Sequence, residues 1–328
     1  MIDFATLEWI GEGLQRPECA LAHGSGLIFA PSWERNGGVS VISPGGATRT
    51  IGAKGATVRP NGIALEAGGT FLLADLGDEF GALNRMDHEG RVEPVLTELD
   101  GRRLPPANFV LLDGEGRIWL TVSTTVRPRA DDYRKGANTG FIVLIDGAGA
   151  RIVADGLGYA NECALSADGE TLFVNETFAR RTSAYRLGAN GALSGRRVVA
   201  EYGAGTYPDG MALDVEGALW ITSIVSNRVI RVMPGGEQRV MLEDMDSAHV
   251  DWAEEAWESD RLGRPHLDQA KSSALRNISN LAFAGEGLGQ AVLGCLLGDR
   301  LARFDSPAPG LAPAHWRADL GPLARFLD

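Results

Sequence analysis

Short apolar runs recur along the chain, and each is followed by a turn and then by a second apolar run. Six such segments align with one another, since each opens on small or polar residues and carries glycine in or beside its turn. Apolar runs paired across a glycine-containing turn are the pattern of a β-hairpin. We therefore expect a chain of repeated hairpins. The segments begin at Pro17, Pro60, Ala107, Ala160, Pro208 and Ile278.

The spacing of these hairpins predicts the architecture. The second residues of the aligned segments are separated by steps of 43, 47, 53, 48 and 70 residues. A period of about 45 residues, built from strands without alternating helices, is typical of one four-stranded propeller blade per repeat. The rest of each repeat, for example GGVSVISPGG, alternates as half-exposed outer strands do. We therefore predict an all-β fold, a six-bladed β-propeller in which residues 1–328 form a single domain.

The two ends of the chain are expected to meet. A strand around Thr6–Ile10 is predicted to pair with a strand near Leu301–Phe304. Pairing of this kind closes the ring and hides the edges of the sheets.

The longest step contains an insertion, Asp246–Pro265, with a helical pattern. Val250, Ala253 and Trp257 fall at positions i, i+3 and i+7, which predicts a short amphipathic helix near residues 246–263. The insertion is either a packing decoration or a lid over the mouth of the channel. The predicted cap is Asp246 or Ser247, and the predicted end is Gly263 followed by Pro265.

Chemistry is expected at one equivalent position in every repeat. The innermost strand of each blade lines the central channel of a propeller, so equivalent residues form a ring around the axis. All six residues at this position carry a side-chain oxygen, although the strands that flank them are apolar. The ring residues are Glu18, Asn61, Asn108, Asn161, Asp209 and Ser279, the last with Asn280 beside it.

Two carboxylates and several carboxamides that converge on an axis suit a hard divalent cation. Ca²⁺ is the best match, with Mg²⁺ and Mn²⁺ as alternatives, and Glu18 and Asp209 together neutralise its charge. Zn²⁺ fits less well, because none of the five histidines falls on the ring. The other interpretation is turn chemistry, since Asn and Asp are common at strand entries for backbone reasons.

A metal on the axis would bind and polarise the carbonyl of a lactone and lower the pKa of a bound water. Asp209 is the best candidate for the general base, because it lies beside that water and is expected to be ionised at neutral pH. Asn108 and Asn61 are placed to hold hydroxyl groups of a sugar-like ring.

A long loop, Ser123–Gly140, adds further candidates for substrate binding. Arg127 and Arg129 can meet a carboxylate in bidentate geometry, and Tyr133 is a third candidate. The alternative for all three is an ordinary solvated loop.

Composition narrows the functional classes. The chain has 43 acidic and 31 basic residues, a net charge of -12, and this balance argues against nucleic acid as a partner. Its start lacks the basic and apolar stretches of a secretory signal, and no apolar run is long enough to span a membrane. Three scattered cysteines fit reduced thiols. We expect a cytoplasmic protein with a small-molecule substrate and no membrane partner; the sequence does not indicate an oligomeric state.

Four stretches carry a family resemblance. They are RPE at Arg16–Glu18, the strand at Asn108, YANE at Tyr159–Glu162 and YPDGMALDVEGALWIT at Tyr207–Thr222. Together they resemble the SMP-30/gluconolactonase/luciferin-regenerating-enzyme family over all six predicted blades, and the last stretch is the most specific. The resemblance implies a lactone-hydrolysing propeller with one divalent metal. Position by position, it assigns the metal to Glu18, Asn161 and Asp209, and the orientation of water and substrate to Asn108.

The chain departs from the family in two respects. Glu162 follows Asn161 where glycine is common, and the segments Ser123–Gly140 and Asp246–Asn277 are long and lie where the family's substrate lids would be. We predict a metal-dependent hydrolase that opens a lactone or another small cyclic ester. The alternatives are a metal-dependent propeller enzyme that catalyses dehydration, cyclisation or condensation, and a ligand-binding propeller whose metal only stabilises the ring.

Overall fold

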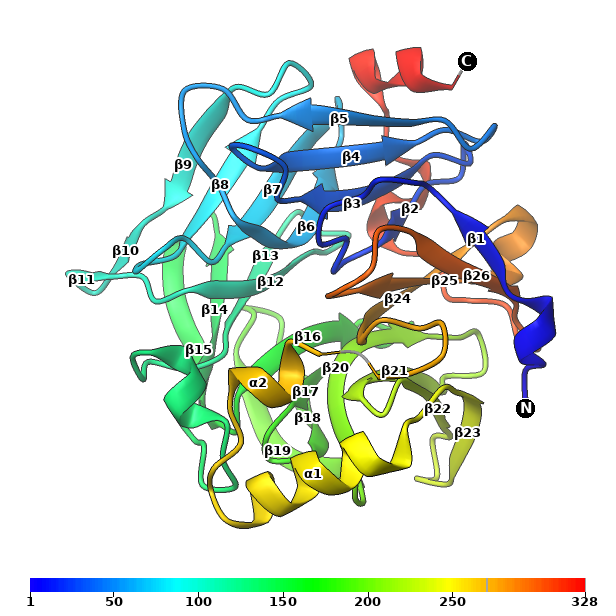
Figure 1. Ribbon diagram of the computed structural model, residues 1–328. Coiled ribbons are helices and arrows are strands. Elements are labelled where there is room, and N and C mark those ends of the chain that lie inside the picture. The colour runs from blue at the N-terminus through cyan, green and yellow to red at the C-terminus, as the bar shows by residue number, and fades with distance from the viewer. Residues whose placement is uncertain (270, 328) are drawn as a thin grey trace.

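The computed structural model describes residues 1–269 and 271–327, and its sheets are arranged around a central axis (Figure 1). In this part of the chain the main strands form six four-stranded antiparallel sheets, which confirms the predicted six-bladed propeller. The innermost strand of each blade follows the loop that enters from the preceding blade, as the repeated hairpins predicted.

The first five blades each run outward from the axis through four consecutive strands. Blade 1 contains β2 (Leu21–Ala22), β3 (Ile28–Ser32), β4 (Gly38–Ile42) and β5 (Thr48–Gly52). Blade 2 contains β6 (Pro60–Glu66), β7 (Thr70–Asp75), β8 (Ala82–Met86) and β9 (Val92–Leu96), and blade 3 contains β12 (Ala107–Leu112), β13 (Ile118–Val122), β14 (Gly140–Asp146) and β15 (Gly149–Leu157). Blade 4 contains β16 (Ala160–Leu165), β17 (Thr171–Glu176), β18 (Arg181–Leu187) and β19 (Leu193–Glu201). Blade 5 contains β20 (Thr206–Leu213), β21 (Leu219–Val225), β22 (Arg228–Val232) and β23 (Gln238–Glu243).

Blade 6 joins the two ends of the chain. It contains β24 (Ile278–Ala284), β25 (Gln290–Cys295) and β26 (Leu301–Asp305), and its outermost strand is β1 (Glu8–Ile10). Glu8 pairs with Arg303 and Ile10 with Leu301, which confirms the predicted closure. The strand begins later than predicted, because Phe4–Thr6 forms a 3₁₀ turn capped by Asp3.

Smaller elements decorate the blades. A short hairpin, β10 (Glu98–Leu99) and β11 (Arg102–Arg103), connects blade 2 to blade 3. The other 3₁₀ helices are η2 (Arg129–Asp132), η3 (Glu286–Leu288), η4 (Ala314–Arg317) and η5 (Gly321–Phe326). No helix in residues 1–269 or 271–327 is long and apolar enough to cross a membrane.

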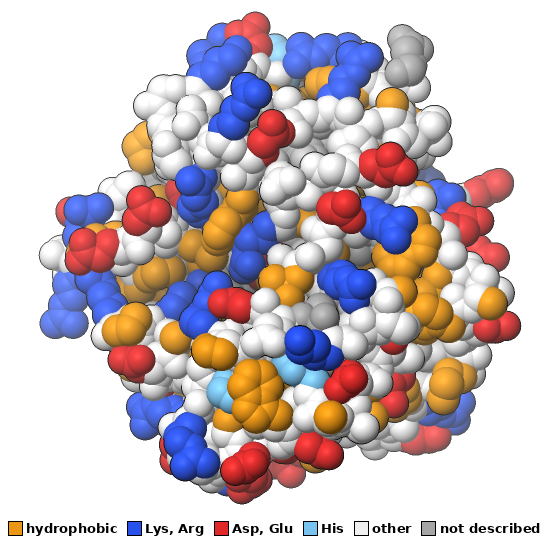
Figure 2. Space-filling model, in the orientation of Figure 1, with side chains coloured by type: hydrophobic (Ala, Val, Ile, Leu, Met, Phe, Trp, Pro, Cys, Tyr) orange, Lys and Arg blue, Asp and Glu red, His pale blue; other side chains and the backbone are white. Residues whose placement is uncertain are grey.

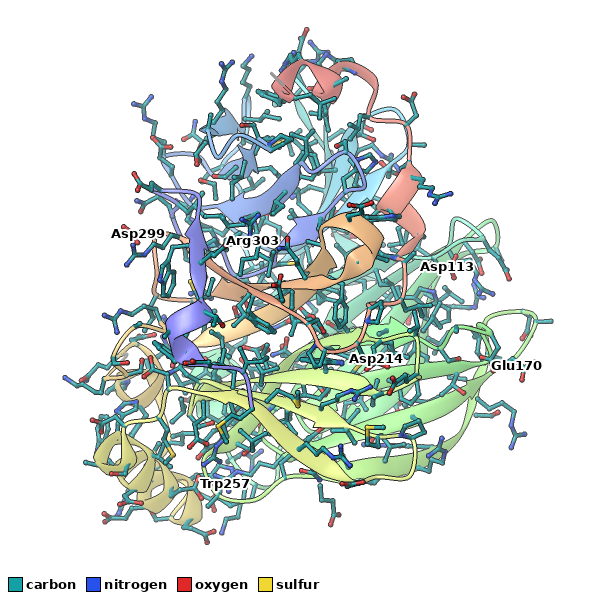
Figure 3. The ribbon with its side chains drawn as sticks, turned by 90° about the vertical axis from the view of Figure 1, so that its right-hand side faces the viewer. Asp113, Glu170, Asp214, Trp257, Asp299 and Arg303 are labelled. Carbon is teal, nitrogen blue, oxygen red and sulfur yellow. The ribbon has the colours of Figure 1, made fainter. Side chains whose placement is uncertain are left out.

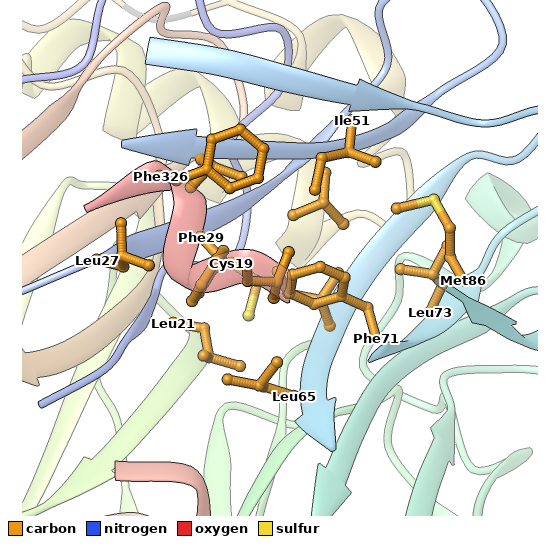
Figure 4. Packing of buried hydrophobic residues seen from close by; sticks show 14 of the residues in the cluster. Cys19, Leu21, Leu27, Phe29, Ile51, Leu65, Phe71, Leu73, Met86 and Phe326 are labelled. Carbon is orange, nitrogen blue, oxygen red and sulfur yellow. The ribbon is translucent and has the colours of Figure 1, made fainter. Parts of the chain in front are cut away.

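Apolar side chains fill the space between adjacent blades. Between blades 1 and 2, Phe29 and Phe71 meet edge to face with ring centroids 5.2 Å apart (Figure 4). Leu323 and Phe326 of η5 belong to the same cluster, so the C-terminal segment packs over these two blades. Each blade therefore buries its apolar residues against its neighbours, and the polar ring residues are left for the channel.

The inner strands are irregular at the ring position. The ladder changes register between Pro60 and Ile63, and again at the equivalent point of the inner strands of blades 3, 4, 5 and 6. A bulge leaves an extra residue out of the ladder and re-aims side chains. Strict alternation between the two faces therefore fails at the residues that matter most for chemistry.

The predicted helix is present as α1 (Ser247–Glu258), followed by α2 (Arg264–Leu267). The side chain of Asp246 caps α1 by accepting the His249 N–H at 2.7 Å. The predicted end was wrong, because α1 ends at Glu258, and Gly263 and Pro265 instead begin α2. Glycine and proline suit a helix start as well as a helix end, and here a second helix follows.

The insertion and the long loop pack together. Val250, Ala253 and Ala256 of α1 share one buried apolar cluster with Tyr133 and Ala137 of the loop. The cluster rests on blades 4 and 5 through Tyr159, Phe178 and Tyr207. Figure 3 shows Trp257 of α1 at one end of the propeller and the hairpins of Asp113, Glu170 and Asp214 at the other. The insertion and the loop therefore cover the same end of the molecule.

Candidate metal and substrate site

The six ring residues are all buried, and contacts between blades link them around the axis. Asn61 Nδ2 donates to the Asn108 carbonyl at 3.0 Å, and Ser279 Oγ donates to the Glu18 carbonyl at 2.7 Å. Between blades 4 and 5, Thr177 Oγ1 donates to the carbonyl of Pro208, the residue before Asp209, at 2.8 Å. The structure thus brings the sequence-predicted ring together.

The pKa of the Asp209 carboxyl is strongly shifted by its surroundings in the site. Burial raises the pKa of its carboxyl well above the ordinary value, and the charges of Glu18 and Glu162 raise it further. Arg16 and a hydrogen bond from Asn161 lower this pKa only in part. Buried carboxylates that repel one another are stabilised in their charged form by a cation between them. In the protein alone, Asp209 is therefore less acidic than the sequence analysis expected.

Glu162 is a functional candidate that sequence reasoning did not place on the axis. Its carboxylate accepts the Met211 N–H and Asn280 Nδ2, each at 2.8 Å, so it bridges blades 4, 5 and 6. Burial raises the pKa of Glu162 to about 8. The two hydrogen bonds lower this pKa, and the charge of Glu18 raises it by a smaller amount. The departure from glycine after Asn161 was the only signal in the sequence, which did not reveal the bulge that turns Glu162 toward the channel.

Asn108 differs from its blade 4 counterpart, Asn161, because it makes no hydrogen bond to the hydroxyl residue that follows the next strand. Asn161 Nδ2 donates to Thr177 Oγ1 at 3.1 Å. In blade 3 the matching atoms, Asn108 Oδ1 and Ser123 Oγ, are both buried without a hydrogen-bond partner. Buried polar atoms are almost always paired, so two orphans at matching positions point to a ligand or water. This supports the assignment of Asn108 to the site.

The donor set fits a hard divalent cation. Glu18 and Asp209 offer carboxylate oxygens, and Asn161 keeps its Oδ1 free because its Nδ2 is the atom bound to Thr177. Within the described ranges, no three His, Cys, Asp or Glu side chains gather as a metal-binding group. A cation here would therefore rely on a carboxamide and water as well as carboxylates, which is typical of Ca²⁺ or Mg²⁺ rather than Zn²⁺.

The three loop candidates lie in different surroundings. Arg129 donates to the Tyr159 hydroxyl at 2.7 Å and lies close enough to Glu18 for their charges to interact. Arg127 stacks on Phe80 at 3.8 Å, with Glu79 at 3.7 Å, and so lies apart on the blade 2 side. Tyr133 is buried against Tyr159 and Phe178, with centroids 5.4 and 4.5 Å away. The structure therefore brings Arg129 to the ring, but not Arg127, and it places Tyr133 in the packing of the loop.

This end of the propeller is hollowed beside the insertion, and basic and apolar side chains line the hollow (Figure 2). A separate cavity of about 520 Å³ lies beyond the ring, walled mainly by apolar residues of the inner strands. Glu162 and Asn280 border that cavity, whereas Glu18, Asn161 and Asp209 do not. The three proposed metal ligands are therefore not part of the wall of this cavity.

Comparison with known proteins places these features in a family. Residues 33–244 match the model of the SMP-30/Gluconolactonase/LRE-like region. The chain belongs to this family. The matched range contains Asn161 and Asp209, whereas Glu18 precedes it.

Similar proteins agree with this assignment. Regucalcin from Xenopus laevis is 25% identical over 229 residues, which is 66% of this chain and 75% of that protein. The structure of a luciferin-regenerating enzyme superposes with a TM-score of 0.70 at 15% identity, over 96% of this chain and 99% of the other. A regucalcin from Agrobacterium tumefaciens, described as calcium-binding, gives a TM-score of 0.66 at 15% identity, over 94% and 98%. At these identities the structural likeness shows the fold alone.

Proposed function

We propose that the protein is a metal-dependent lactone hydrolase whose metal is held by Glu18, Asn161 and Asp209. The observation that carries this proposal is the convergence, at equivalent positions of separate blades, of two buried carboxylates that repel each other and a carboxamide with a free oxygen. The family membership supports it, because the family includes gluconolactonases. Calcium is the proposed metal, on the donor chemistry and on the calcium-binding description of the Agrobacterium relative.

The ring side chains have separate roles in this proposal. A bound divalent cation supplies Lewis-acid polarisation of a carbonyl and a lowered pKa for water. Asp209 accepts the proton of the attacking water, and the proton then passes to the alcohol oxygen released when the ring ester bond breaks. Asn108 Oδ1, which has no protein partner, accepts a hydrogen bond from a substrate hydroxyl or from that water. Asn61 assists in holding the hydroxyl groups.

The mouth of the site suits a polar substrate. Arg129, fixed by the Tyr159 hydroxyl, lies close enough to Glu18 for their charges to interact, and it would offer a cation to a carboxylate or hydroxyl of the substrate. The long loop and α1 pack on each other over blades 4 and 5, and they would limit the entry of water and of bulky substrates. A small polar or acidic lactone therefore fits better than one with a long acyl chain.

Hydrolysis of simple aldonolactones, followed with calcium and with excess chelator, tests the proposal. Turnover should require the metal, and Asp209→Asn should lower kcat by about 10²- to 10⁴-fold, the usual value of a positioned base. The matched control is Asp168→Asn, an exposed aspartate of blade 4 that binds only residues of its own turn. Ring opening that survives the chelator, or a near-native rate in Asp209→Asn with metal still bound, would contradict it. Metal binding without any ring opening would favour a non-hydrolytic enzyme or a ligand-binding propeller.

A further inference from the structure

Arg16 contacts the candidate metal site directly. Its Nη2 donates to Glu18 Oε2 at 2.9 Å, and the side chains are 19% and 9% exposed. Salt and water screen such a pair much less than they screen a surface ion pair. One oxygen of the proposed metal ligand is therefore already bound to a protein cation.

The position of Arg16 is fixed by its surroundings. Its guanidinium lies 4.5 Å from the centroid of the Trp33 ring, and Trp33 is itself held by an Nε1 hydrogen bond of 2.8 Å to the Pro60 carbonyl. The backbone of Arg16 is left-handed, with φ of 56°, a conformation that costs a residue other than glycine free energy. A residue kept in such a conformation and stacked on a fixed aromatic ring is held toward Glu18 rather than being a mobile surface arginine.

Blade 2 provides an internal comparison. Arg59 stands two residues before Asn61, just as Arg16 stands two before Glu18, and its guanidinium lies 5.9 Å from the same Trp33 ring. Arg59 Nη1 donates to the carbonyls of Arg35 and Val58, not to a ring side chain. The two arginines therefore share a position and an aromatic neighbour, but only Arg16 pairs with a proposed metal ligand.

The charges around Arg16 explain what it does there. The carboxylates of Glu18 and Asp209 repel each other in a buried region, and the positive charge of Arg16 favours the ionised form of Asp209. Glu18 Oε1, in contrast to Oε2, accepts no hydrogen bond from the described residues. A cation on the axis can therefore approach Oε1 while Arg16 holds Oε2.

We propose that Arg16 is the resident counter-cation of this metal site, an inference that rests on the metal-dependent function proposed above. Arg16 stabilises the carboxylates before the metal binds, and it keeps Glu18 Oε2 occupied afterwards. Glu18 then ligates through one oxygen, and the affinity for the metal is lower than the carboxylates alone would give. Ca²⁺ accepts bidentate carboxylates, whereas Mg²⁺ requires near-octahedral geometry. Arg16 therefore also reduces the preference of the site for Ca²⁺ over Mg²⁺.

Calorimetric titration of the full-length chain with Ca²⁺ and with Mg²⁺ tests this role. Arg16→Gln removes the competing charge, so it should bind Ca²⁺ about tenfold more tightly or better, with a smaller gain for Mg²⁺. In chelator the variant should melt at a lower temperature than the native protein, because the carboxylates lose their counter-cation, and added Ca²⁺ should remove that difference. Arg59→Gln is the matched control and should change neither affinity.

The outcomes separate this inference from the proposed function. Equal and measurable Ca²⁺ affinities in the native protein and Arg16→Gln would overturn the role of Arg16 and leave the metal site intact. The same gain in Arg59→Gln would also overturn the role of Arg16. The gain would then come from the loss of any nearby positive charge rather than from the contact of Arg16 with Glu18. Absence of metal binding in all three proteins would overturn the proposed site itself. Arg16→Lys is the second variant should Arg16→Gln fail to fold. Its ammonium keeps the charge but lacks the planar group that stacks on Trp33, so it is held less firmly on Glu18 and its Ca²⁺ affinity should exceed the native value.

Discussion

Glu162 shows how one residue alters the electrostatics of the channel. Its carboxyl is buried below the ring, and Asn280, which donates to it, is fixed in turn because Asn280 Oδ1 accepts the Ala20 N–H at 2.8 Å. With a pKa raised to about 8, chiefly by burial, the group holds a proton in the folded protein that the unfolded chain releases near pH 4.5. Ionisation of Glu162 therefore opposes folding.

The sign of this effect gives a pH prediction. Between about pH 4.5 and 8 the folded state binds one more proton than the unfolded state. The contribution of Glu162 to the free energy of unfolding therefore falls as pH rises, by up to about 1.4 kcal/mol per pH unit. Glu162→Gln cannot titrate, but its amide places N–H against the fixed Asn280 amide, which costs about 1–3 kcal/mol. The native protein should be the more stable at pH 5, and the gap should close or reverse by pH 8.

Urea unfolding at several pH values, in chelator, measures this difference. The control is Glu115→Gln, an exposed glutamate whose curve should run parallel to the native curve across the range. A gap between native protein and Glu162→Gln that stays constant with pH would show that Glu162 keeps its charge in the folded state.

At the level of elements, two hairpins each carry an aspartate at the same position, and this aspartate organises the turn. Asp214 accepts the N–H groups of Glu216 and Ala218 and the Trp220 Nε1, at 2.9 to 3.0 Å, and it also binds Arg231. Asp113 of blade 3 does the same with Glu115, Arg117 and Trp119. The corresponding turn of blade 4 has Ser166 and Phe173 in place of aspartate and tryptophan. The most specific stretch of the family resemblance thus has a structural cause.

Loss of this aspartate should cost stability. Asp214→Ala leaves Arg231 Nε and the Trp220 N–H buried without an acceptor, although Arg231 Nη2 keeps its pair with Glu216. The free energy of unfolding should therefore fall by about 3–5 kcal/mol. Asp168→Ala in blade 4 is the control, because Asp168 is exposed and binds only its own turn, and its effect should stay within about 0.5 kcal/mol. Chemical denaturation followed by tryptophan fluorescence measures both. Equal losses of unfolding free energy in the two variants would show that the buried Asp214 stabilises the fold no more than the exposed Asp168 does.

The hairpins also show which features of the fold and of the site could be predicted from the sequence. Repeated pairs of apolar runs predicted the blades and the ring residues, because both depend on local pattern and on spacing. The positions of Arg16 and Glu162 could not be predicted, since they depend on a left-handed backbone and on a bulge that break the alternation of faces. Arg127 and Arg129 look equivalent in sequence, yet Arg127 stacks on Phe80, whereas Arg129 binds Tyr159 and interacts with the charge of Glu18.

At the scale of the whole molecule, contacts distant in sequence hold the site end together. Arg180 pairs with Glu254 of α1 and stacks on Trp257 at 3.5 Å, while the Tyr207 hydroxyl donates to Glu254 at 2.9 Å. Tyr207 stands two residues before Asp209, so the insertion is fixed to the strand that carries the proposed base. The insertion is therefore part of the architecture of the site, and its movement would be transmitted to blade 5.

The ring as a whole depends on the short strand β1. Removal of residues 1–10 takes away the outer partner of the Leu301–Asp305 strand, which keeps only its pairing with β25, and so exposes a sheet edge. It also uncovers the apolar cluster to which Phe4, Leu7 and Trp9 contribute. We expect a lower melting temperature and association of the truncated protein at micromolar concentration, measured by calorimetry and light scattering. Glu8→Ala is the matched control: it keeps the strand and removes only the exposed pair with Arg303, which is worth about 0–1 kcal/mol. A truncated protein that melts as the native one does, and stays monodisperse when the native one is monodisperse, would show that the ring is closed by the other three strands of blade 6 alone.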